Sequence, residues 1–238
     1  MNVKIATLSD IGGRSNNDDT VMVRQKEDSA WVFVGDGLGG YAGGQMASEA
    51  AAAAIMEQSH RGSLLIENRM TEAAEAANRA VREVQETKKG NMKTTMVFLT
   101  IEDGRAKWMH VGDSRLYHFH CGQLVSQTID HSVSQMAVLM GEITPREIRF
   151  HEDRNRVLRA LGSESAKPEI SRTVMLTGNE DVFLLCTDGF WEYVYEEEME
   201  SLLHKSKNPE QWLEEMRQIL MTRTLRDNDN FTAAAVFC

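Results

Sequence analysis

Aspartates stand at the edges of predicted strands in five places along this chain, and this arrangement most constrains its fold. Asp36, Asp113 and Asp188 each follow an apolar run, whereas Asp19 and Asp229 each precede one. Antiparallel pairing brings the C-terminal end of one strand beside the N-terminal end of its neighbour. An aspartate that closes one strand can therefore meet an aspartate that opens the next. The pattern favours antiparallel strands with carboxylates gathered at one edge.

A gathered set of carboxylates has a chemical consequence. Five such groups repel one another, and the repulsion costs free energy unless cations lie between them. Ligands that are all oxygen favour hard ions such as Mg²⁺ or Mn²⁺. The sequence therefore suggests a multi-metal site built on strand ends.

The hydrophobic periodicity indicates two kinds of element. Strands are expected near 2–8, 19–25, 30–35, 94–101, 105–111, 114–119, 169–175, 181–186 and 231–237. Helices are expected near 43–60, 64–88 and 208–224. Turn signals between 94 and 119 are typical of a meander. We therefore predict an α+β fold, a four-layer sandwich of two antiparallel sheets flanked by antiparallel helix pairs.

The chain of 238 residues has three prolines and no Gly/Ser-rich or Pro-rich linker. A single domain over 1–238 is the simpler interpretation. The stretch from about 130 to 168 differs, because it is polar and weakly periodic, with short helical pieces expected near 132–140 and 154–161. Such excursions are often lids or substrate-facing segments, so we predict a flap there.

Charge and cysteine usage narrow the partners and the compartment. The net charge of −10 argues against nucleic acid, and bound cations would offset part of it. Apolar runs are too short to span a membrane, and the first residues lack an apolar signal core. The scattered, odd-numbered Cys121, Cys186 and Cys238 suit a reducing compartment. We expect a cytoplasmic protein.

Five short motifs occur in a characteristic order. They are Arg14-Ser-Asn-Asn-Asp18-Asp19, Gly35-Asp36-Gly37-Leu38-Gly39-Gly40, Asp113-Ser-Arg115, Asp188-Gly189 and Asp229-Asn230-Phe-Thr232. A lone Asp-Gly is more often a simple turn. The ordered set, however, resembles the metal-dependent protein phosphatase family, the type 2C serine/threonine phosphatases, from Ser9 to the C-terminus. The resemblance implies removal of phosphate from phosphoserine or phosphothreonine by a bacterial-type enzyme that uses Mn²⁺ or Mg²⁺.

The resemblance also implies a role for each matching residue in a binuclear centre. Asp36 matches the bridging carboxylate, and the Gly37 carbonyl matches a ligand of one ion. Asp188 and Asp229 match ligands of the other ion. A water shared by the two ions would have a lowered pKa and would attack phosphorus directly.

Further matches surround this centre. Asp18 and Asp19 correspond to carboxylates that reach the ions mainly through water, and Asp113 joins Asp188 at a possible third ion. Arg14 matches an arginine that binds substrate phosphate, which a guanidinium contacts through two oxygens at once. Glycines beside Asp36 allow close approach of the backbone, and Gly39-Gly40 allows a sharp exit into the following helix.

Other interpretations of these residues stay open at this point. Asp36 and Asp188 would then only end strands, Asp113 would pair with Arg115 or cap a turn, and Arg14 would be an ordinary surface residue. Structural roles are expected for Thr94, Thr95 and His131, and core positions for the cysteines. No metal is expected at His110, His118, His120 or His151, because these lack ligand spacing with a cysteine.

Two departures and two rival functions qualify the resemblance. Leu38 replaces a histidine proposed as general acid in animal members, and Lys93 replaces a usual glycine. One rival is a non-catalytic or regulatory member of the fold, although such proteins usually lose carboxylates. The other is a small-molecule metallophosphatase. The resemblance implies phosphoprotein substrates and a cognate kinase, and we expect a monomer.

Overall fold

The computed structural model describes residues 2–39, 43–66, 68–164, 166–224 and 227–238. Two antiparallel sheets dominate it. One has the order β1 (Lys4–Asp10), β13 (Phe231–Phe237), β12 (Asp181–Cys186), β8 (Arg115–His120) and β9 (Gln123–Gln127). The other has the order β10 (Glu169–Ile170), β7 (Arg105–Val111), β6 (Met96–Glu102), β3 (Ser29–Gly35) and β2 (Thr20–Lys26), and β11 (Val174–Met175) also pairs with β7. A small ladder joins β4 (Gly37–Leu38) to β5 (Lys93–Thr94).

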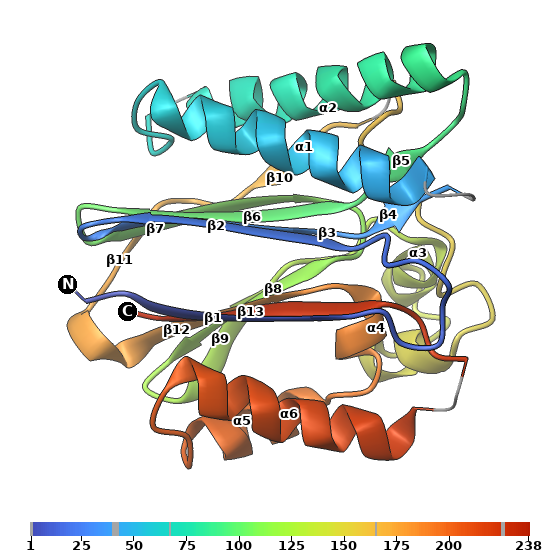
Figure 1. Cartoon of the computed structure of the whole chain (residues 1–238). Helices are drawn as coiled ribbons and strands as arrows, with labels where there is room; N and C mark the ends of the chain where they lie inside the picture. Colours follow the sequence, from blue (N-terminus) through green and yellow to red (C-terminus); the bar gives the residue numbers. More distant parts are fainter. Residues whose placement is uncertain (1, 40–42, 67, 165, 225–226) are drawn as a thin grey trace.

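Helix pairs cover the outer faces of the two sheets (Figure 1). α1 (Gly43–His60) and α2 (Arg69–Lys88) lie over the second sheet, and α5 (Glu196–Leu203) and α6 (Pro209–Arg223) lie over the first. Short helices α3 (Val133–Leu139) and α4 (Asp188–Trp191) lie at one end of the sandwich, and the 3-10 turns are η1 (Pro145–Phe150) and η2 (Gly178–Glu180). The predicted four-layer α+β architecture is confirmed.

Three apolar layers hold the sandwich together. Between the sheets, side chains such as Val32, Leu99 and Leu185 are fully buried. Against the outer faces, α1 buries the small residues Ala47 and Ala51, which let this helix lie close to its sheet. Apolar burial of this kind contributes roughly 25 cal/mol per Å² removed from water. The alternation of inward and outward residues thus fixes which face of each strand meets which layer.

The predicted meander is only partly correct. β6 and β7 form a hairpin, but β8 leaves that sheet and pairs with β12 in the other. The chain turns at Gly112, whose φ of +104° favours glycine, and a Cβ there would lie 2.7 Å from the Thr95 side chain. This crossing places Asp113 between the two sheets.

Several predicted boundaries also need correction. Residues 154–161 form turns rather than a helix, because Leu158 and Leu161 donate backbone hydrogen bonds to His131 and Thr94 instead of along a helix. The expected strand at 169–175 is two short strands on β7. The helix expected from 64 begins at Arg69, since the Leu64 N–H donates to Glu102. β9, η1 and α5 were not predicted.

The flap predicted for 130–168 contains α3 and η1 with irregular chain around them. Two isolated bridges fix this stretch: the bridge from Ser132 to Val157 joins two parts of it, and the bridge from Thr94 to Leu161 joins it to β5 of the small ladder. Within the described residues, no helix combines the length and apolar character needed to cross a bilayer.

Candidate active site

The strand ends meet as the sequence predicts. Thr20 of β2 pairs with Gly35 of β3, so Asp19 and Asp36 lie at the same end of that sheet. Cys186 of β12 pairs with Ala233 of β13, which brings Asp188 close to the chain that enters β13. A cavity of about 420 Å³ opens at this end. Its lining includes Arg14, Asp18, Asp36, Gly37, Leu38, Asp113, Asn155, Asp188, Asp229 and Asn230.

Asp36 is positioned through its backbone. Its N–H donates to Thr95 Oγ1 at 2.9 Å, and its carbonyl accepts from Thr94 Oγ1 at 2.9 Å and from the Thr95 N–H at 2.8 Å. Thr95 Oγ1 is also 2.6 Å from Ser114 Oγ. The paired threonines therefore have the structural role expected of them. Among the described residues, no group donates a hydrogen bond to the Asp36 carboxylate, which leaves its oxygens available for a ligand.

Gly37 allows the first turn of α1 to approach the cavity. A Cβ at Gly37 would lie 2.2 Å from the Gly44 carbonyl carbon and oxygen, and a Cβ at Gly44 would lie 2.3 Å from the Gly37 oxygen. Neither position tolerates a side chain without moving backbone. Gly39 has a φ of +147°, whereas Gly40, predicted to allow the exit into the helix, lies outside the described residues.

Hydrogen bonds fix the two adjacent aspartates differently. Asp19 is 7% exposed, and its Oδ2 accepts from Thr187 Oγ1 at 2.8 Å. Asp18 Oδ1 accepts from the Gln45 N–H at 3.2 Å, in the first turn of α1, where unpaired N–H groups favour negative charge. Asp19 thus belongs to the buried floor, and Asp18 to the rim.

Arg14 and Asp229 form a two-pronged ion pair at the mouth of the cavity. Arg14 Nε donates to Asp229 Oδ1 at 3.0 Å, and Nη2 donates to Oδ2 at 2.9 Å. Both side chains are about half exposed, at 53% and 44%. Arg14 is therefore no isolated surface arginine, since its guanidinium lies on the acidic cavity.

Asn230 organises this region, a role that the sequence analysis did not assign. Its Oδ1 accepts from the Asp18 N–H at 2.8 Å, while its Nδ2 donates to the carbonyls of Ile11 and Asn16. One buried amide thereby joins the loop before β2 to the start of β13. An asparagine directly after a predicted ligand is a signal that was available, but its partners are more than two hundred residues away.

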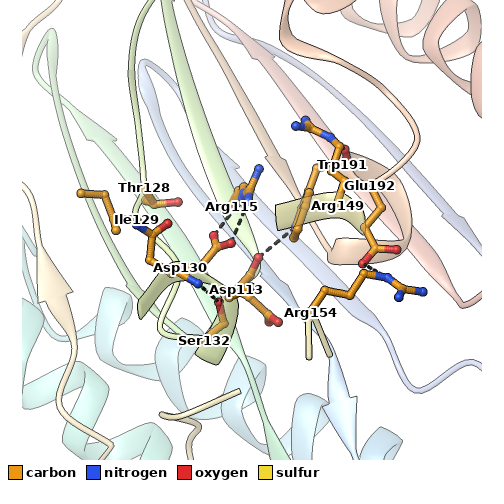
Figure 2. A network of polar contacts seen from close by, with 12 residues as sticks. Asp113, Arg115, Thr128, Ile129, Asp130, Ser132, Arg149, Arg154, Trp191 and Glu192 are labelled. Atoms are coloured by element: carbon orange, nitrogen blue, oxygen red, sulfur yellow. Dashed lines mark hydrogen bonds and ion pairs between the residues drawn. The ribbon is translucent and has the colours of Figure 1, made fainter. Parts of the chain in front are cut away.

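Asp113 is 2% exposed and does not pair with Arg115 (Figure 2). Arg115 instead donates to both oxygens of Asp130, at 2.8 and 2.7 Å, and its guanidinium lies 3.4 Å from the centre of the Trp191 ring. Trp191 Nε1 in turn donates to the Asp113 carbonyl at 2.9 Å. The alternative in which Asp113 pairs with Arg115 is therefore wrong, and the arginine joins the flap to the sheet.

The neighbouring flap contributes residues that sequence reasoning missed. Arg154 pairs with Glu192 at 3.1 Å, as Figure 2 shows, and Asn155 lines the cavity. Arg14, Arg154 and Arg223 also line an adjoining cavity of about 300 Å³. The same cavity is also lined by Asp188, Glu192, Asp227 and Asp229, so arginines and carboxylates together line the approach to the acidic floor.

Burial and mutual repulsion disfavour the ionised form of the clustered aspartates. Burial is the main cause that raises the pKa of Asp19 and of Asp113 to about 7. Burial, followed by the charge of Asp36, raises the pKa of Asp188 well above its ordinary value, and burial raises that of Asp36 similarly. Cations among these oxygens would remove the repulsion and keep the carboxylates ionised. This all-oxygen donor set fits Mn²⁺ or Mg²⁺.

Comparison with known proteins agrees with this geometry. Residues 9–229 match the family described as Protein phosphatase 2C. The serine/threonine protein phosphatase PstP of Mycobacterium tuberculosis is 32% identical over 202 residues, which are 82% of this chain and 38% of that protein. The serine/threonine phosphatase stp of Listeria welshimeri is 31% identical over 235 residues, covering 93% of this chain and 89% of that one.

Solved structures are similar over nearly the whole chain. The crystal structure of PstP from Mycobacterium tuberculosis superposes with a TM-score of 0.87 at 28% identity, over 99% of this chain and 98% of that one. A structure of the PstP catalytic domain in complex with two manganese ions has a TM-score of 0.84 at 27% identity, over 99% and 97% of the two chains.

The fold and the acidic cavity define a protein of the Protein phosphatase 2C type, whose all-oxygen donor set suits Mn²⁺ or Mg²⁺. The chain belongs to the Protein phosphatase 2C family, and the two relatives named above are from bacteria. It spans 38% of the length of the mycobacterial relative.

Proposed function

We propose that the chain removes phosphate from phosphoserine and phosphothreonine in other proteins, and that residues of the acidic cavity do this work. One observation carries the proposal: a single cavity collects six carboxyl-bearing or phosphate-binding side chains at the ends of both sheets. Those residues are Arg14, Asp18, Asp36, Asp113, Asp188 and Asp229.

Asp36, the Gly37 carbonyl, Asp188 and Asp229 are the residues that would hold two cations. When bound, these ions supply an activated water and neutralise phosphoryl oxygens. Asp18 and Asp19 would fix ordered waters around them, because Asp19 lies in the floor and Asp18 on the rim. Asp113, which lines the same cavity as Asp188, would serve a weaker third ion.

Arg14 would exchange its partner when substrate arrives. In this structure the Arg14 guanidinium donates hydrogen bonds to both carboxylate oxygens of Asp229. A phosphate group presents a similar pair of oxygens. An Asp229 carboxylate that binds a cation would attract the guanidinium less strongly, because the cation offsets its negative charge. The Arg14 side chain is half exposed, so it reaches a phosphate at the mouth without rearranging the core.

The leaving group has no obvious proton donor at position 38. Leu38 lines the cavity and carries no ionisable atom. The leaving serine or threonine alkoxide would then take its proton from solvent. This expectation separates the chain from family members that have a histidine there.

The wider setting belongs to the same proposal. The homologues are phosphoprotein phosphatases, which supports protein substrates and a cognate kinase. Net charge of −10 supports a role without nucleic acid. We extend the proposal to a cytoplasmic monomer that signals by dephosphorylation, on the grounds of cysteine usage and charge.

Phosphate release distinguishes the proposal from its rivals. The purified chain should release inorganic phosphate from a phosphothreonine peptide with Mn²⁺, and much less from nucleotides or sugar phosphates. A preference for the small molecules would favour a small-molecule phosphatase. No release from any substrate by a metal-loaded, folded protein would favour a non-catalytic member of the fold.

A further inference from the structure

The end of the first sheet that is remote from the acidic cavity carries a second group of metal-ligating side chains. His120 ends β8, Cys121 follows it in the turn to β9, and Glu180 directly precedes β12. One donor atom from each lies within 4.8 Å of the other two. Because β8 and β12 run the length of the sheet between the two ends (Figure 1), the group lies about 17 Å along the strands from the cavity.

A buried carboxylate holds His120 in the tautomer that metal binding requires. The Asp181 side chain is 2% exposed, and its Oδ1 lies 3.2 Å from His120 Nδ1. Since an ionised carboxylate only accepts, the ring proton belongs on Nδ1, which leaves a lone pair on Nε2. That atom faces Glu180 Oε2 at 3.8 Å. Histidine ligands in proteins commonly donate their other ring N–H in this way.

Asp181 is itself fixed by further contacts. Its Oδ1 also lies 2.8 Å from His118 Nε2, and its Oδ2 accepts from the Thr177 N–H at 2.8 Å. His120 is therefore oriented by a rigid, buried partner rather than by chance contact at the surface.

Cys121 is exposed in a turn, so the core position expected for it is wrong, whereas Cys186 and Cys238 are buried as expected. The φ of Cys121 is +51° and that of Gly122 is +77°, a two-residue hairpin turn in which asparagine is the usual first residue. A cysteine is not favoured in this left-handed conformation, so backbone geometry does not explain why a thiol stands at this position. The Cys121 N–H donates to the Glu180 carbonyl at 2.9 Å, which keeps the thiol beside that residue. Desolvation and the Glu180 carboxylate raise the pKa of this thiol, and a bound cation would reverse that effect.

We propose that His120, Cys121 and Glu180 bind a thiophilic divalent cation such as Zn²⁺, at a site separate from the catalytic ions. Imidazole, thiolate and carboxylate are all zinc ligands, and water would complete the tetrahedron. Tetrahedral zinc places neighbouring donor atoms roughly 3.5 Å apart, close to the 3.8 Å found between His120 and Glu180. The Cys121 thiol gives its proton to solvent on binding. The cation fastens the β8–β9 turn to the start of β12.

The linear spacing of the histidines and cysteines gave no expectation of a metal here, because Glu180 completes the group only in the folded chain. A second trio, His110, His131 and Glu169, is equally compact. There, however, the Gly112 N–H donates to His131 Nδ1 at 3.2 Å, so the neutral ring carries its proton on Nε2, toward Glu169. A protonated nitrogen has no lone pair for a cation, so we assign the site to His120.

Co²⁺ serves as the probe for this site in the full chain, under reducing conditions. Cobalt on a thiolate has an intense charge-transfer absorption, which cobalt on oxygen ligands alone lacks. At saturation we expect the intensity of this band to correspond to one thiolate-bound Co²⁺ per chain, because Co²⁺ in the catalytic cavity does not contribute to it. The band should disappear when Zn²⁺ is added. Absence of the band at excess Co²⁺ would overturn the proposal.

Four variants assign the band to its ligands. Cys121→Asn suits the left-handed turn, so it should fold and lose the band completely. Glu180→Gln should weaken Co²⁺ binding tenfold or more. Asp36→Asn, altered in the catalytic cavity, and His60→Gln, an exposed histidine on α1, should keep the band. A band that survives in Cys121→Asn, or one that is lost in Asp36→Asn, would show that the thiolate site does not exist.

Discussion

Arg14 contacts Asp229 in this structure, whereas its proposed partner during catalysis is the substrate phosphate. Arg14→Ala should raise KM more than it lowers kcat, because phosphate binding in both ground and transition states would weaken. The penalty in kcat/KM should be about 1.5–3 kcal/mol, as for a charge-assisted contact. Steady-state kinetics on a phosphothreonine peptide measure this.

Arg61→Ala is the matched control, because Arg61 also forms an exposed ion pair, with Glu57 on α1. It should leave both constants unchanged. Thermal stability should change little in either variant, since exposed pairs contribute little. Parental kinetics for Arg14→Ala would return Arg14 to the surface and remove it from the site.

Among the charges that raise the pKa of Asp188, that of Asp36 contributes most. Asp188→Asn keeps the shape of the side chain but removes the charge that would hold a cation, so kcat should fall by about 10²-fold or more. Circular dichroism should show a folded protein. Asp103→Asn, at an exposed turn, provides the control. Unchanged kcat with a normal manganese content would contradict the assignment of Asp188.

Leu38 allows a test of leaving-group chemistry. A serine or threonine alkoxide leaves less readily than p-nitrophenolate and depends more on proton donation. Leu38→His places a group with a pKa near working pH in the cavity. The ratio of kcat for phosphothreonine peptide to kcat for p-nitrophenyl phosphate should therefore rise. Equal changes with both substrates would show that position 38 has no part in protonation.

At the scale of elements, the flap is joined to the first sheet by a buried ion pair. Asp130 lies at the start of the flap and Arg115 opens β8, and their side chains are 2% and 3% exposed. Asp130→Asn would leave the buried guanidinium with only Glu196, 3.7 Å from its Nη1, as a counter-charge, so the free energy of unfolding should fall by about 3 kcal/mol. Urea denaturation measures this.

Asp153→Asn makes the same change elsewhere in the flap, in a partly exposed pair with Arg156. It should cost less than about 1 kcal/mol. Equal, small losses for both variants would mean that the buried pair does not fasten the flap.

Local signals account for what the sequence predicted and what it missed. Asp19, Asp36, Asp188 and Asp229 were placed correctly because each stands next to an apolar run, and antiparallel pairing then brings strand ends together. The long helices were found from their periodicity. The expectations for ligand roles came from resemblance, and they stay predictions.

The remainder depends on contacts between distant segments. The crossing of β8 to the other sheet depends on how Gly112 packs against Thr95. Likewise, the partner of Arg115 is fifteen positions away in a segment without periodicity, and the partners of Asn230 are near the other end of the chain. Neither propensity nor spacing contains this information.

At the scale of the whole molecule, the two sheets together concentrate negative charge at one end. Purified protein should hydrolyse p-nitrophenyl phosphate with Mn²⁺ and lose this activity in EDTA, and added Mn²⁺ should restore it. Removing the metal should also lower thermal stability, because the carboxylates then repel one another without counter-ions. Full turnover in a chelated sample would exclude a metal-dependent mechanism.

The pairing of β1 with β13 has a practical consequence for handling the protein. Lys4 lies opposite Phe237, whereas Asp10 and Phe231, at the other ends of these strands, lie beside the acidic cavity. Attachments made next to Lys4 or Phe237 therefore emerge together, on the side facing away from incoming substrate (Figure 1). A molecule anchored to a bead or fused to a fluorescent reporter at either point keeps an open cavity, so immobilised and single-molecule assays should report the same turnover as free solution.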